Sequence, residues 1–136
     1  MTQAQVLQGD AIEVLGTLAS CGMPRGWVGL YRRDYDLATP ESNALPAKAS
    51  WGLAFKIIEH LEDLGLLKPG GTVLDPMAGT GRFLLAACAR GYKAVAVELE
   101  PKFITMLTDN RAYASKRLGR EIDLTIIQGD SRKLSS

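Results

Sequence analysis

Three acidic side chains and one glycine-rich turn are the features of this sequence whose types and spacing could do chemistry. Asp75 lies just before the turn Gly79-Thr80-Gly81, Glu98 follows further along the chain, and Asp130 lies near the C-terminus. Because glycine has no Cβ, a ligand can approach the backbone of such a turn, and a helix that follows it presents free N–H groups. A glutamate at this distance beyond the glycines can accept hydrogen bonds from both hydroxyls of a ribose.

The turn departs from the fingerprint of dinucleotide-binding proteins in two ways. Leu84 stands where that fingerprint has its third glycine, and the carboxylate of Asp75 would repel a pyrophosphate. A carboxylate at this position instead favours a ligand that carries an ammonium or another cationic group. Asp130 can accept a hydrogen bond from an adenine amino group, and Leu99 beside Glu98 can lie against an adenine face.

These residues are expected to meet at one edge of a parallel sheet. The apolar runs 72–74 and 94–97, which precede Asp75 and Glu98, are typical of buried strands, and the small-residue run that ends at Ala89 is typical of a helix. Such a strand–helix–strand unit has a right-handed crossover and binds ligands at the carboxyl ends of its strands. Residues 124–127 predict a third strand. We therefore expect an α/β, three-layer Rossmann-like sheet with parallel strands in the order 3-2-1.

Two further helices are predicted beside this unit. Pro101 begins one that runs to about Leu118, and Ser50 caps another that runs to about Leu66. The second has apolar residues at helical spacing, which are Leu53, Ile57, Leu61 and Leu64. Residues 6–7 and 27–31 are expected to form strands, and residues 32–48 read as irregular. The expected organisation is an N-terminal segment with a flexible loop at 1–44 and a ligand-binding domain at 45–136.

Composition and charge restrict the class of protein. The chain has 136 residues, 46% of them hydrophobic, which is enough for one domain with a core. A formal charge of +1 excludes a strong general field for polyanions. Cys21 and Cys88 have no metal-ligand spacing, and Cys88 is expected to be a buried free thiol. With no apolar run that could cross a membrane and no secretory signal pattern, we expect a cytoplasmic protein without a membrane partner.

Three carboxylates around a glycine turn select a nucleoside with a cationic tail, and S-adenosylmethionine has these parts. At the same residues the sequence resembles the amino-methylating DNA methyltransferases. Segment 75–81, Asp-Pro-Met-Ala-Gly-Thr-Gly, is similar to their D-P-x-x-G-x-G cofactor motif, and segment 94–101 is similar to their second, acidic motif. Segment 45–50 resembles their P-A-K element, and segment 128–132 resembles the stretch just upstream of their catalytic loop. The resemblance covers roughly residues 45–134.

The resemblance implies S-adenosylmethionine as cofactor and DNA, at adenine N6 or cytosine N4, as methyl acceptor. It implies that Glu98 holds the ribose, that Asp130 and Leu99 hold the adenine, and that Lys48 contacts the tail of the cofactor. The methionine side would be lined by the segment Asp75, Pro76, Ala78, Gly79, Thr80 and Gly81.

The catalytic loop of that family has no counterpart in this sequence. The loop reads D/N/S-P-P-Y/F/W, and no such tetrapeptide occurs here, so the catalytic residues are unassigned. We expect a truncated piece, a loop supplied by another chain, or a protein that binds the cofactor without transferring methyl. The open edge of the first strand would invite pairing with the N-terminal segment or with a second chain or copy. An RNA or small-molecule methyltransferase and a non-catalytic cofactor-binding or assembly module are the alternatives.

Overall fold

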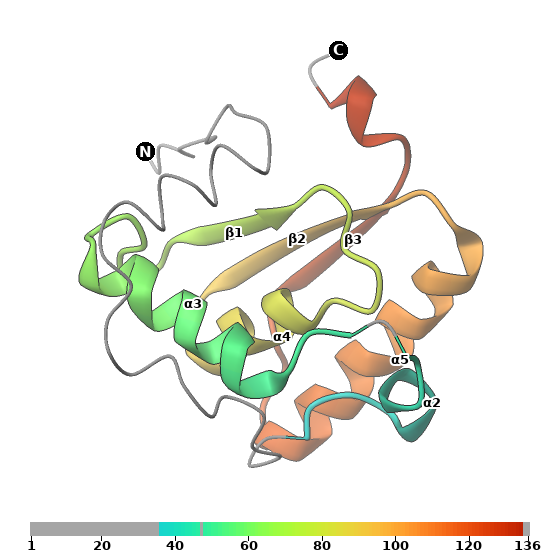
Figure 1. Cartoon of the computed structure of the whole chain (residues 1–136), viewed down its shortest axis with the longest axis horizontal. Coiled ribbons are helices and arrows are strands. Elements are labelled where there is room, and N and C mark those ends of the chain that lie inside the picture. The colour runs from blue at the N-terminus through green and yellow to red at the C-terminus, as the bar shows by residue number, and fades with distance from the viewer. Residues whose placement is uncertain (1–35, 47, 135–136) are drawn as a thin grey trace.

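The computed structural model describes residues 36–46 and 48–134 (Figure 1). Strands alternate with helices along this part of the chain, as expected for an α/β fold. The elements are α2 (Pro40–Asn43), α3 (Trp51–Asp63), β1 (Thr72–Asp75), α4 (Arg82–Ala89), β2 (Lys93–Glu98), α5 (Pro101–Leu118), β3 (Leu124–Gln128) and the short 3-10 helix η1 (Ser131–Lys133).

The three strands form one parallel sheet in the order β1-β2-β3. Asp75 pairs with Ala96, and Glu98 pairs with Gln128, so all three strands end at the same edge of the sheet. The strand order 3-2-1 and the Rossmann-like arrangement that the sequence predicts are confirmed.

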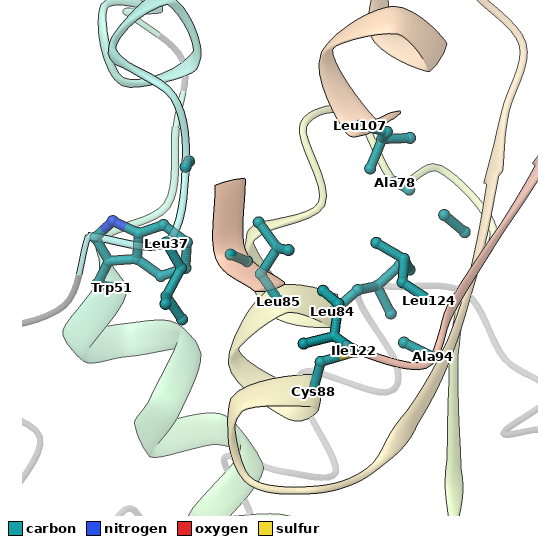
Figure 2. Close-up of a cluster of buried hydrophobic side chains, with 13 residues drawn as sticks. Leu37, Trp51, Ala78, Leu84, Leu85, Cys88, Ala94, Leu107, Ile122 and Leu124 are labelled. Atoms are coloured by element: carbon teal, nitrogen blue, oxygen red, sulfur yellow. The ribbon is translucent and has the colours of Figure 1, made fainter. Parts of the chain in front are cut away.

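Helices α3, α4 and α5 lie on the same side of the sheet (Figure 1). Alternate residues of the strands point towards them and join one buried cluster with the apolar face of α4 and with Leu107 of α5. Leu84, Leu85 and Cys88 of α4 lie at the centre of this cluster in Figure 2. Cys88 is a buried free thiol, as expected, and burial raises its pKa to about 11.

The opposite face of the sheet is covered unevenly, since Val97 of β2 is only 1% exposed. Leu74 is 46% exposed and Ile127 is 43% exposed, although both lie within strands. Parallel sheets are ordinarily covered on both faces, and here the sheet together with α3, α4 and α5 forms two layers of the expected three. Within residues 36–46 and 48–134, no strand pairs with the outer edge of β1. Pairing of that edge with another segment or copy stays a prediction.

The apolar face that the sequence predicts for α3 is not the face that is buried in the structure. The buried residues are Trp51, Ala54 and Ile58, whereas Leu64 is exposed. The small residues Ala86 and Ala87 of α4 lie in the same buried cluster as Ala54 and Ile58. Close approach of two helices through alanines decides which face of α3 is covered, and the spacing of the larger leucines does not report it.

The ends of the predicted helices are close to those observed. Ser50 caps α3 by accepting a hydrogen bond from Leu53 N, and α5 begins at Pro101 and ends at Leu118. Residues 36–46, assigned from sequence to the N-terminal segment and loop, contain α2 and contribute Leu37 and Ala38 to the buried cluster. The strands expected at 6–7 and 27–31, and Cys21, lie outside the described residues.

Candidate functional site

Backbone hydrogen bonds connect the carboxyl ends of the three strands. Ala78 N, in the turn after β1, donates to Val97 O of β2 at 3.1 Å. Gly129 N, just beyond β3, donates to Glu98 O at 3.0 Å. The structure thus brings the glycine turn, Glu98 and the approach to Asp130 to one edge, as the sequence predicts.

The Glu98 carboxylate connects β2 to the glycine turn. Its Oε2 accepts a hydrogen bond from Gly79 N at 2.9 Å, and its Oε1 accepts from Leu99 N at 2.8 Å and from Glu100 N at 2.9 Å. Three backbone donors therefore fix the carboxylate at the mouth of the turn. A carboxylate has about four lone-pair positions, so it retains acceptor capacity for a ligand hydroxyl.

The Asp75 carboxylate lies at the tip of β1, close enough to Glu98 for the two charges to interact. Its Oδ1 accepts a hydrogen bond from Met77 N at 3.0 Å. Burial raises the pKa of Asp75, the Met77 hydrogen bond opposes this, and the nearby charge of Glu98 raises the pKa further. Two neighbouring carboxylates at a partly desolvated position form a site that a cation would stabilise.

The two glycines of the turn have different roles. Gly79 has φ +54° and a Cβ built on it would meet nothing within 4 Å, so the space beside it is open. Gly81 has φ +81°, and a Cβ there would lie 2.5 Å from Leu107 Cδ2 of α5. Gly81 is therefore required by packing inside the protein, whereas the open side of Gly79 is available to a ligand.

Asp130 and Leu99 lie at the same edge of the sheet, and neither residue is buried. Leu99 is 57% exposed. Asp130 caps η1 through Arg132 N at 3.0 Å and forms an ion pair with the Arg132 guanidinium, Oδ2 to Nη2, at 2.6 Å. Hydrogen bonds from Arg132 lower the pKa of Asp130. The predicted contact with an adenine amino group would require Asp130 to share or exchange this partner.

The Lys48 ammonium contacts backbone carbonyls of the preceding segment. Its Nζ donates to Leu45 O at 3.1 Å and also to Asn43 O. The predicted contact of Lys48 with a ligand tail stays a prediction. Pro76 and Met77 are exposed at the tip of the turn, with Met77 77% exposed, and Ala78 and Thr80 are largely covered.

Asn110 and Arg82 lie beside the turn, and the sequence did not predict a role for either residue. The Asn110 side chain of α5 is fully buried, accepts from Thr39 N at 2.9 Å and donates to Thr80 O at 2.9 Å. The guanidinium carbon of Arg82, the first residue of α4, lies 4.6 Å from the centre of the Trp51 ring. A polar residue inside the apolar face of a helix is the signal that could have identified Asn110.

Neither a metal-binding cluster nor a membrane-spanning helix is found in the described residues. No group of three His, Cys, Asp or Glu side chains in residues 36–46 and 48–134 is arranged to hold a metal ion. None of the helices in the same ranges is long and apolar enough to cross a membrane.

Among solved structures, one superposes on this chain over most of the described residues. TrmN from Thermus thermophilus superposes with a TM-score of 0.52 and 24% identity over 70% of this chain, and 27% of the TrmN chain is covered. This chain has a Rossmann-like methyltransferase fold. An RNA methyltransferase from Salinibacter ruber, solved with S-adenosyl-L-homocysteine, is 21% identical over 65% of this chain and 52% of its own, with a TM-score of 0.45.

A shorter sequence match is found with a different class of enzyme. Cystathionine beta-synthase of Apis mellifera is 49% identical over 72 residues, which is 52% of this chain. The chain spans only 13% of the length of this curated relative. No protein-family model matches the chain.

Proposed function

We propose that this chain is the S-adenosylmethionine-binding part of a methyltransferase, and that the acceptor is DNA at adenine N6 or cytosine N4. The proposal is supported by the fold, by the D-P-x-x-G-x-G segment and by the acidic residues gathered at one sheet edge. The single observation that carries it is the hydrogen bond of 2.9 Å between Gly79 N and Glu98 Oε2. It sets a ribose-binding carboxylate directly against an open glycine turn.

In this proposal, each side chain at the sheet edge contacts one part of the cofactor. Glu98 accepts the ribose hydroxyls, and Leu99 with Asp130 borders the adenine. The positive sulfonium and the ammonium of the tail then lie near Asp75, whose pKa is raised mainly by burial and further by the nearby charge of Glu98. Methyl transfer from a cofactor bound in this way needs an acceptor amine in line with the methyl–sulfur bond. The chain would contribute the orientation of the cofactor and electrostatic stabilisation of its charges.

DNA is the finer part of the proposal, and it rests on the P-A-K segment, 45–50. An RNA or small-molecule acceptor would use the same cofactor residues. The two are separated by incubating the complete enzyme with labelled S-adenosylmethionine and either duplex DNA or RNA. Label in DNA supports the proposal, and label only in RNA contradicts it.

Binding of S-adenosylhomocysteine, measured by calorimetry, tests the cofactor part. We expect saturable heat with the wild-type chain and affinity about 10- to 100-fold weaker for Glu98→Gln, since hydrogen bonds to a charged group are lost. Glu121→Gln is the matched control, because Glu121 is exposed and away from the strand tips. No heat with a folded wild-type chain would contradict cofactor binding and favour a non-catalytic module.

The match to cystathionine beta-synthase favours a second candidate, a fragment of an amino-acid synthase. The match is local, and only 13% of that enzyme is covered. The same calorimetry distinguishes the two, because a synthase fragment has no reason to bind an adenosyl ligand through Glu98.

A further inference from the structure

Arg82 is a buried cation that is only partly satisfied within the described residues. It is the first residue of α4, directly after the glycine turn, and is 7% exposed. Its Nη2 donates to Asn43 Oδ1 at 2.5 Å, and its guanidinium lies over the Trp51 ring. Its Nε is buried and has no hydrogen-bond partner among the residues that the structure describes.

The unpartnered atom belongs to a fork of two donors. The Nε–H of arginine and one Nη–H point in the same direction, and this edge matches the two oxygens of a carboxylate. Asn43 offers one amide oxygen to the fork, so it serves Nη2 and leaves Nε unsatisfied. Asp36 is the nearby acidic residue, but it contacts Asn43 Nδ2, at 2.8 Å, rather than the guanidinium.

The position of Arg82 adds a second feature that favours an anion. The N-cap residue of α4 is Gly81, which has no side chain, and within residues 36–46 and 48–134 no side-chain cap bond is made at this N-terminus. The positive end of the helix dipole and the guanidinium are therefore adjacent. Burial lowers the pKa of Arg82, and the charge of Asp36 raises it, which indicates that the cation is incompletely compensated.

We infer that Arg82 binds the α-carboxylate of the cofactor tail, with that carboxylate replacing the Asn43 amide oxygen on the Nε–Nη2 edge. This inference rests on the proposed function. The tail of the cofactor is a zwitterion, and the two ends of the turn have matching charges. Asp75 at the end of β1 takes the ammonium, and Arg82 at the start of α4 takes the carboxylate.

The test compares two ligands on two proteins by calorimetry. S-adenosylhomocysteine has the carboxylate, and its decarboxylated analogue keeps the adenosine, sulfur and amine. We expect Arg82→Gln to weaken binding of S-adenosylhomocysteine about 10- to 100-fold while changing binding of the analogue less than about twofold. An equal loss for both ligands would show a merely structural role and overturn the inference.

Two controls keep the test decisive. Arg90→Gln removes a cation at the other end of α4, where Arg90 pairs with Glu62 at 2.6 Å, and should leave both affinities unchanged. If Arg82→Gln does not fold, the wild-type protein decides, because equal affinity for the two ligands overturns the inference. If the folded wild type binds neither ligand, the proposed function fails as well, which is a different result from equal binding.

Discussion

Replacing each glycine of the turn by alanine should have unequal effects on stability. Both residues have positive φ, which costs an L-residue about 1–2 kcal/mol. At Gly79 this is the whole expected cost, because the new Cβ meets nothing within 4 Å. At Gly81 the Cβ would lie 2.5 Å from Leu107 Cδ2, and Leu107 is fully buried. Overpacking adds about 1–3 kcal/mol, so we expect about 2–5 kcal/mol for Gly81→Ala.

The comparison is made by urea denaturation at neutral pH, with the free energy of unfolding measured for wild type and both variants. Alanine also restricts the unfolded chain, but it does so equally at the two positions, so this effect cancels in the difference. The expected difference between the variants is therefore about 1–3 kcal/mol. In a protein that already carries Leu107→Ala, adding Gly81→Ala should cost nearly as little as Gly79→Ala costs in the wild type, because the side chain that the new Cβ would meet is shortened.

The same pair of variants separates stability from binding. Gly79→Ala should fold and lose affinity for S-adenosylhomocysteine, since its methyl group occupies the open space beside the turn. Equal destabilisation by the two substitutions, or no recovery with Leu107→Ala, would refute the packing argument. Unchanged affinity in Gly79→Ala would refute the assignment of that space to the ligand.

Three further substitutions test other parts of the site. The folded-state pKa of Asp75 is raised, so its contribution to stability is full below the unfolded pKa and is lost as pH rises through the folded pKa. Asp75→Asn should therefore raise the free energy of unfolding at pH 7, with the gain vanishing below about pH 3, in denaturation curves across pH. Asn110→Ala leaves Thr39 N and Thr80 O without partners and should cost about 2–5 kcal/mol by the same method. Arg132→Gln frees the Asp130 carboxylate and should strengthen binding of S-adenosylhomocysteine a few-fold by calorimetry, and a weakening would show that Arg132 itself supports the ligand.

The sequence was sufficient to predict the sheet and the edge that carries the site. The spacing of apolar residues is a local signal, and it was enough to predict the strands. Pro101 and Gly119, which begin and end helices, were likewise enough to predict the bounds of α5. Both glycines of the turn were also identified, but their different roles depend on Leu107, which comes from another helix. No local pattern contains that contact.

Tertiary contacts also explain what was missed around the turn. Leucines dominate the pattern of α3, yet Ala54 marks its covered face because small side chains permit close helix packing. Arg82 directly follows the glycine motif, and its contacts with the Trp51 ring and with Asn43 Oδ1 come from residues distant in the sequence. Side-chain direction at a helix start is set by the neighbouring elements.

The bonds from Ala78 N to Val97 O and from Gly129 N to Glu98 O use main-chain atoms alone, so substitutions of side chains at these positions leave the donors and acceptors in place. Mutational tolerance should therefore be uneven around the rim of the sheet. The link from Gly79 N to Glu98 Oε2 differs, because one of its two atoms belongs to a side chain. Glu98 is consequently a position at which a single codon change removes both a side-chain contact between β2 and the turn and the proposed acceptor for a ribose.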